Sequence, residues 1–212
     1  MHMMSLKTHN ALSNGITQSY LIAYIYLMSD RKNIESYQDV SPGIGTDVYI
    51  HPTASVIGDV ELGNNASIWP GTVVRGDVNF IRVGAGTNVQ DLSVLHVSHK
   101  SSWDPQGAPL IIGSNVTIGH KVILHGCTIK DECLIGMGSI VMDKVIVQKH
   151  VLIGAGTLVP EGKTLESGYL YLGSPARKVR KLTDKELEHF MYSANHYIRL
   201  KNHYLNQIGG EH

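Results

Sequence analysis

Three histidines in the middle of the sequence could bind a metal, provided that the fold brings them together. His96 and His125 each follow a leucine directly, in "VLHVS" and "ILHGC", so they share one position of a repeated unit. His120 lies five residues before His125, in "TIGHK". A spacing of five suits neither one face of a helix nor one face of a flat strand. Three neutral imidazoles with an open fourth position are the ligand set of a catalytic zinc site.

An aliphatic residue that recurs every six positions indicates the fold. The series of aliphatic positions begins at Ile50 and Val56 and ends at Val159. It is interrupted twice, and the step before Ile129 is five residues instead of six. Two positions earlier lies a small or β-branched residue, as Ala54 does before Val56. This period is the signature of a parallel β-helix, whose coils stack through parallel ladders around aliphatic side chains. We therefore predict an all-β fold, with one C-terminal α-helix packed alongside.

The sequence divides into four predicted segments. Residues 1–27 form an N-terminal extension that could be a misplaced start, because Met28 opens the ordinary cytosolic start "MSDRKNIESYQDV". Residues 28–46 are a lead-in, residues 47–180 the β-helix and residues 181–208 the C-terminal helix. The helix is expected to begin after Thr183, because Thr183 and Glu186 match a capping box. The apolar run 20–27 is too short to span a bilayer.

Composition excludes several classes of partner. The 18 lysines and arginines balance the 18 aspartates and glutamates, so no nucleic-acid or membrane partner is expected. Two cysteines are no disulfide framework, which favours a cytoplasmic location. Cys127 and Cys133 both fall on the small inward position of the repeat and are predicted to be buried structural thiols.

The repeat resembles that of the hexapeptide-repeat family. The units "IGDVEL", "VGAGTN", "IGSNVT", "IGMGSI" and "IGAGTL" carry this resemblance. It implies a left-handed β-helix with three faces and about eighteen residues in each coil. The handedness rests on the resemblance alone, because left-handed crossovers break the usual rule.

A coil of this length brings two of the histidines together. His96 and His125 are 29 residues apart, which is one coil of about eighteen residues plus eleven. The non-repeat stretch "SHKSSWDPQGAP" between them has the composition of a loop. If it loops out, the two histidines stack one coil apart, at about 4.8 Å. That separation suits two ligands of one metal.

His120 falls on the preceding face of the prism, too distant to join the other two within one chain. A threefold assembly would bring His120 of one subunit to His96 and His125 of its neighbour. The sequence therefore predicts a homotrimer with metal sites between subunits.

Longer motifs resemble the gamma-class carbonic anhydrases, most closely their bacterial YrdA-like branch. They are "IWPGTVVRGDVNFIRVG", "TNVQDLSVLHVSHK", "PLIIGSNVTIGHKVILHGCTI", "LIGMGSIVMD" and "ESGYLYLGSPARKVRKL", within residues 28–205. The resemblance implies that the three histidines bind a metal between subunits of a homotrimer. A metal-bound hydroxide would then hydrate carbon dioxide to bicarbonate reversibly. Zn²⁺ is the expected cofactor, with Fe²⁺ or Co²⁺ as alternatives.

The same resemblance suggests roles for further side chains. Gln90 would orient the hydroxide or the substrate, and Asn88 and Asp91 would support the pocket. Arg75 and Asp77 would form a charged pair beside the metal, which could equally be a plain interface salt bridge. Tyr192, on the terminal helix, could reach over the site, although helix periodicity alone would also place a tyrosine there.

Two departures from the family pattern weaken the expected activity. Glutamates that serve proton transfer in the archetypal member align here with Val78 and, without gaps, with His99. A histidine can shuttle protons, but the loss of both carboxylates makes weak hydration the expectation.

Three alternatives to hydration remain open. One is an acyltransferase of the hexapeptide class, which acts on a coenzyme A thioester and normally relies on one histidine as base. Another is a thioesterase that uses the same metal hydroxide. The third is a non-enzymatic trimer in which the metal only holds the subunits together.

Overall fold

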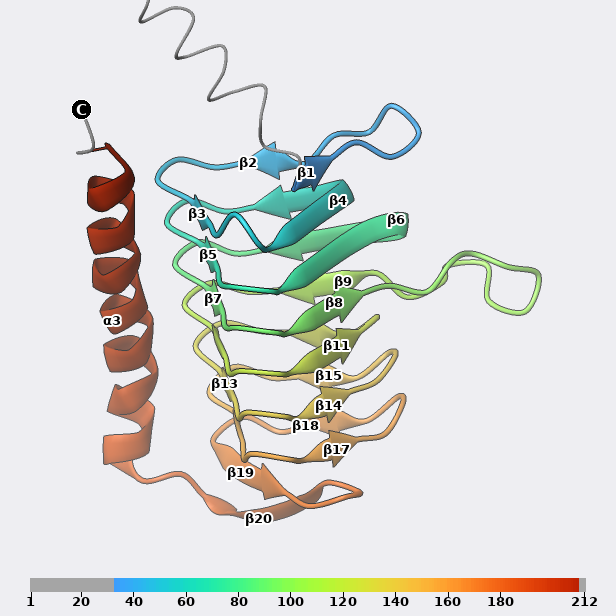
Figure 1. Ribbon diagram of the computed structural model, residues 1–212. Coiled ribbons are helices and arrows are strands. Elements are labelled where there is room, and N and C mark those ends of the chain that lie inside the picture. Colours follow the sequence, from blue (N-terminus) through green and yellow to red (C-terminus); the bar gives the residue numbers. More distant parts are fainter. Residues whose placement is uncertain (1–32, 210–212) are drawn as a thin grey trace, which may run out of the picture. The chain divides into compact units, whose positions relative to one another are not determined.

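The described part of the chain is a β-helix with one long helix beside it (Figure 1). The computed structural model describes residues 33–209, so the predicted N-terminal extension lies outside the described residues. The chain crosses the front from left to right, returns behind and descends, which makes the β-helix left-handed (Figure 1). The all-β fold with one C-terminal helix is therefore confirmed.

Each coil contributes one short strand to each of three faces. Face 1 is an eight-stranded sheet of β3 (Tyr49–Ile50), β5 (Ser67–Ile68), β7 (Asn88–Val89), β10 (Thr117–Ile118), β13 (Leu134–Ile135), β16 (Leu152–Ile153), β19 (Tyr169–Leu172) and the antiparallel β20 (Arg177–Lys181).

Faces 2 and 3 together form the twelve-stranded sheet, because β4 (Ser55–Leu62) and β6 (Val73–Val83) run through the corner between them. Face 2 continues with β8 (Val94–His96), β11 (Ile123–His125), β14 (Ile140–Val141) and β17 (Leu158–Val159). Face 3 continues with β9 (Leu110–Ile112), β12 (Thr128–Ile129), β15 (Ile146–Val147) and β18 (Thr164–Leu165). Two short strands, β1 (Ile34–Glu35) and β2 (Gly43–Ile44), pair with β4.

The inward positions of the hexapeptide fill the interior. Leu95, Leu124 and Val141 stack in register on successive coils and are fully buried. Close packing also selects the residues at the corners. A Cβ atom on Gly84 would lie only 2.4 Å from the backbone of Gly113 on the next coil. Asn115 takes the left-handed backbone region with φ of 56°, which asparagine tolerates better than most residues.

The predicted burial of both cysteines is confirmed. Cys127 and Cys133 are 1% and 0% exposed and form no disulfide bond. Burial raises the pKa of the Cys133 thiol to about 12, so it stays protonated near neutral pH. These thiols are therefore packing groups.

The non-repeat stretch loops out, as expected from the arithmetic. It leaves the corner between faces 2 and 3 and extends away from the β-helix (Figure 1). Ser98 and Ala108 pair at its base, and Trp103 is 95% exposed. Because Ser98 and Ala108 bring the two ends of the loop together, the coil period continues after the loop as if the extra residues were absent.

The terminal helix α3 (Asp184–Gly209) packs along face 1. The predicted capping box is present: the Thr183 amide donates to Glu186 Oε2 at 2.9 Å, and the Glu186 amide donates to Thr183 Oγ1 at 3.3 Å. Phe190 and Ala194 are buried against the β-helix. Within residues 33–209, no helix is both long and apolar enough to cross a membrane.

We expect Glu186→Gln to lower the free energy of unfolding by about 1 kcal/mol at pH 7, because the cap loses a charged acceptor. Hydrogen bonds from Arg180 and from the Thr183 amide lower the pKa of Glu186 to about 2. The ionised Glu186 therefore contributes its full stabilisation to the folded state above the unfolded-state pKa of about 4.5. This stabilisation is lost as the pH falls towards 2.

Urea unfolding at fixed protein concentration measures this difference from pH 7 to pH 3. Glu188→Gln, at an exposed position of the same helix that takes no part in the cap contacts, is the control. A difference that stayed constant over this pH range would contradict the proposed role of the charge.

Candidate metal centre

His96 and His125 lie side by side at the edge between faces 2 and 3. They pair in register on β8 and β11, as predicted. His96 Nδ1 lies 3.1 Å from His125 Nε2. Two imidazoles on one tetrahedral zinc, with Zn–N of about 2.0–2.1 Å, have nitrogens about 3.3 Å apart. The pair is therefore arranged like two ligands of one metal.

Carboxylates hold the outer nitrogens of both rings. His125 Nδ1 lies 2.6 Å from Asp143 Oδ1, and His96 Nε2 lies 3.2 Å from Asp77 Oδ1. Arg75 donates to the other oxygen of Asp77. A carboxylate on the nitrogen that faces away from the metal fixes the tautomer and orientation of a ligating histidine. We call these five residues the His96–His125 half-site.

The electrostatics around His96 favour its neutral imidazole. Burial lowers the pKa of His96, the charges of Arg75 and His125 lower it further, and Asp77 partly opposes them. Burial also acts to raise the pKa of Asp77, but hydrogen bonds with Arg75 and His96 outweigh it and lower the pKa. A neutral imidazole beside an ionised carboxylate is the form in which histidine binds metals.

The second group of side chains lies at the other edge of face 2, where it meets face 1. His120 follows β10, and its Nδ1 lies 2.9 Å from Asp91 Oδ2. Gln90 is 6% exposed and donates to Asn88 Oδ1 at 3.0 Å, and Asn88 in turn donates to Thr117 Oγ1 at 3.1 Å. Nε2 of His120 and Oε1 of Gln90 take part in no hydrogen bond within residues 33–209. His120, Asp91, Gln90 and Asn88 form the His120 half-site.

Neither half-site is complete in one chain. Among the described residues, no group of three or more histidine, cysteine, aspartate or glutamate side chains could hold a metal. This follows from the strand assignment, because β10 belongs to face 1 whereas β8 and β11 belong to face 2. One chain thus presents two of the predicted ligands, His96 and His125, at one edge of face 2 and the third, His120, at the other.

Two of the predicted site residues are not joined to either half-site. Tyr192 is 62% exposed on α3 and stacks between His189 and His196. His99 is exposed at the base of the loop, and it forms no hydrogen bond or ion pair within the described part of the chain.

Sequence reasoning missed Asp143. It holds His125, and it also accepts a hydrogen bond of 2.7 Å from Ser98 at the base of the loop. Asp143 follows His125 by eighteen residues, which is one coil. The coil period used to pair the histidines would therefore have found their carboxylate partner as well.

Comparisons with known proteins found a matching family model and several similar relatives. The family model described as bacterial transferase hexapeptide (six repeats) matches residues 41–76. Protein YrdA of Escherichia coli is 55% identical over 82% of the chain and 95% of YrdA. Gamma carbonic anhydrase 2, mitochondrial, of Arabidopsis thaliana is 44% identical over 82% of the chain and 62% of that protein.

A solved structure shares the fold over nearly its whole length. It is described as a hexapeptide transferase family protein from Anaplasma phagocytophilum and is 42% identical, with a TM-score of 0.76. The match covers 82% of this chain and 99% of that one.

We expect Asp77→Asn to lower the pKa of His96 further in metal-free protein. The substitution removes the hydrogen-bonding carboxylate that opposes burial and leaves the positive charge of Arg75 uncompensated. NMR titration of the histidine ring protons measures this shift. Asp131→Asn, which changes a carboxylate that caps Ser114 on another corner, is the control. An unchanged or raised pKa of His96 in Asp77→Asn would contradict the assigned contact.

Proposed function

Because the chain belongs to the gamma carbonic anhydrase-like family of hexapeptide-repeat proteins, we propose that it is a metal-dependent lyase that hydrates carbon dioxide reversibly. Its sites would lie between the subunits of a homotrimer. The observation that carries this proposal is the pair of carboxylate-backed half-sites at the two edges of face 2. The edge with His96 and His125 lacks a third ligand, which the edge with His120 of the next subunit would supply.

The outward side chains of face 2 support the trimer. Val73, Val94, Ile123, Ile140 and Leu158 stack in one aliphatic ladder, in register over five coils. The middle three are 37–39% exposed, and α3 lies on face 1 and leaves this ladder uncovered. A continuous apolar surface of this kind marks a protein interface. A head-to-tail contact between unlike edges closes into a ring when the rotation permits, and three copies turn the ladders towards one axis.

The donor set fits a divalent metal. His96 and His125 of one subunit and His120 of the next would hold it, each with its other nitrogen on a carboxylate. Zinc suits three imidazoles with an open position, and Fe²⁺ or Co²⁺ can be held by the same ligands. When bound, such a metal activates water near neutral pH for attack on carbon dioxide.

The surrounding side chains would orient the reactants. Gln90 holds its amide nitrogen on Asn88, which leaves its carbonyl oxygen free to accept a hydrogen bond from the reacting water. The Arg75–Asp77 pair keeps the ring of His96 in place. Tyr192 would close the pocket from α3 of the neighbouring subunit.

Proton transfer is the step that this chain serves least well. Val78 replaces an acidic residue beside Asp77 and is 42% exposed. His99, which aligns without gaps with the second glutamate, is exposed at the loop base and could pass protons to solvent in its place. We therefore propose weak hydration.

An acyltransferase acting on a coenzyme A thioester is the second candidate. The relative described as a hexapeptide transferase family protein, which shares the fold, favours it. Acyl transfer needs one histidine as base and no metal, so metal content separates the two functions. A thioesterase and a non-enzymatic, metal-held trimer stay as further alternatives. The cytoplasmic location also stays a prediction.

Mixed trimers test the shared site. His120→Ala and His125→Ala should each abolish metal-dependent hydration of carbon dioxide, measured by stopped flow. When the two variants are unfolded, mixed in equal amounts and refolded together, about a quarter of the sites should regain all three histidines. Activity and metal content should rise to that fraction.

The matched control mixes His96→Ala with His125→Ala. Both substitutions damage the same half-site, so no combination of these subunits restores a complete site. Equal recovery in the two mixtures would refute the shared site. Wild-type protein without a metal-dependent rate above buffer would refute the enzymatic function.

The carboxylate on His125 should control metal affinity. Asp143→Asn keeps the shape of the side chain but removes the charge that holds Nδ1, so zinc affinity should fall by about 10- to 100-fold. Competition with a chromophoric chelator measures this change. Asp131→Asn, on the corner between faces 3 and 1, is the control. Unchanged affinity in Asp143→Asn would contradict its supporting role.

A further inference from the structure

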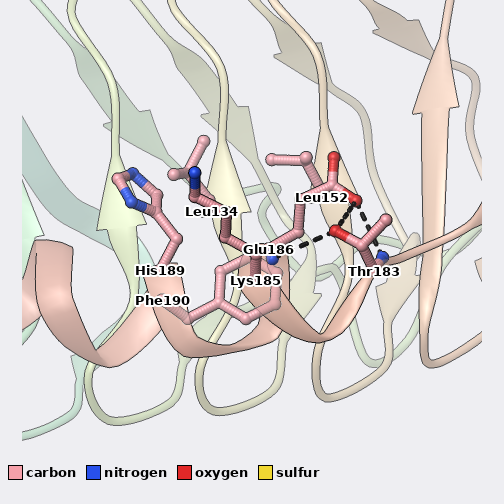
Figure 2. A pocket seen from close by; sticks show the side chains of 7 residues that line it. All are labelled: Leu134, Leu152, Thr183, Lys185, Glu186, His189 and Phe190. Carbon is pink, nitrogen blue, oxygen red and sulfur yellow. Dashed lines mark hydrogen bonds between the residues drawn. The ribbon is translucent and has the colours of Figure 1, made fainter.

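A hollow with an apolar floor lies between the first two turns of α3 and face 1 (Figure 2). Its volume is about 330 Å³. Its lining residues are Leu134, Leu152, Thr183, Lys185, Glu186, His189 and Phe190. The hollow belongs to one chain and uses no residue of either half-site. It is therefore independent of the proposed metal and trimer.

The hollow follows from a change of side-chain size along α3. The helix packs most closely against β3, β5, β7 and β10, where the small Ala194 is fully buried. One turn earlier the buried position is taken by Phe190, whose ring stacks on His150 with centroids 6.1 Å apart. The larger ring fills the gap on one side and leaves space beside it. Leu134 and Leu152 form the floor of this space and remain half-buried.

The charges on the rim are unbalanced. Arg180 balances the charge of Glu186 at 2.8 Å, and the Thr183 amide donates a hydrogen bond to the same carboxylate. The side chain of Lys185 forms no ion pair or hydrogen bond within residues 33–209, and it projects with His189 to the Leu134 side of the hollow (Figure 2). The His189 ring stacks only on its helical neighbour. The rim thus offers an ammonium group and an imidazole that form no ion pair within the described residues, because the Glu186 carboxylate on the same rim is already paired with Arg180.

We propose that this hollow binds a free carboxylate with a straight aliphatic chain of six to eight carbons. The chain would cover Leu134, Leu152 and Phe190, and the carboxylate would contact Lys185. A volume of about 330 Å³ has room for about eleven water-sized groups at about 30 Å³ each, and octanoate has about ten non-hydrogen atoms. One flexible ammonium suits a single anionic head, because it is a point charge without the planar fork of arginine.

Chain length tests the apolar part of the site. Calorimetric titration with butanoate, hexanoate and octanoate should show affinity rising about fourfold per methylene, from about 0.8 kcal/mol per buried CH₂. Decanoate should gain no more, because the hollow is then full. Leu152→Asn changes an outward side chain on the floor of the hollow, so it should reduce the gain in affinity per methylene. An affinity that did not depend on chain length would overturn the proposal.

Charge tests the head group. Lys185→Gln should weaken octanoate binding several-fold, whereas Lys181→Gln, on the exposed strand β20, should not. Methyl octanoate, which lacks the charge, should bind wild type about as weakly as octanoate binds Lys185→Gln. Equal binding of acid and ester, or equal effects of the two lysine substitutions, would overturn the proposal. Unchanged melting temperature and metal content in Lys185→Gln would show that fold and half-sites are intact.

Discussion

The parallel stacking of equivalent residues on successive coils is the constraint on which the rest of the structure depends. An inward aliphatic must meet another inward aliphatic above and below, as Leu124 meets Leu95 and Val141. Since the ladder fixes this register, outward and corner residues are fixed with it. A side chain on one coil therefore finds its partner one coil away, as His125 finds Asp143.

This constraint leaves the three faces free to differ in their outward residues. Face 1 carries residues that α3 covers, such as Thr117, which hydrogen-bonds to Ser193 at 2.9 Å. Face 2 carries a continuous aliphatic ladder, and face 3 mixes apolar with charged residues such as Arg82, which pairs with Asp59. One interior thus supports an intramolecular contact on one face and an uncovered apolar surface on the next.

The chemistry gathers at the corners, where the repeat tolerates irregularity. The loop between β8 and β9 absorbs eleven residues without disturbing the register and places Ser98 against Asp143. Asn79 holds the same loop base by donating to the Ser98 carbonyl at 3.0 Å. A rigid interior with variable corners lets such a fold host several chemistries, which is why transferase and carbonic anhydrase relatives share it.

The sequence by itself determined the parallel β-helix, because a period of six with aliphatic inward positions is its signature, although the left hand came only from the resemblance to the hexapeptide-repeat family. It also determined the pairing of His96 with His125 and the separation of His120 from both, since these follow from counting residues along coils. Only the tertiary structure showed that a carboxylate contacts each of the three rings, and that the side chains of Tyr192 and His99 form no hydrogen bond or ion pair with either half-site. Side-chain direction at a corner depends on local backbone angles and neighbours, which periodicity does not encode. The hollow beneath α3 was likewise invisible in the sequence, because it arises from how Phe190 packs between two elements far apart in the chain.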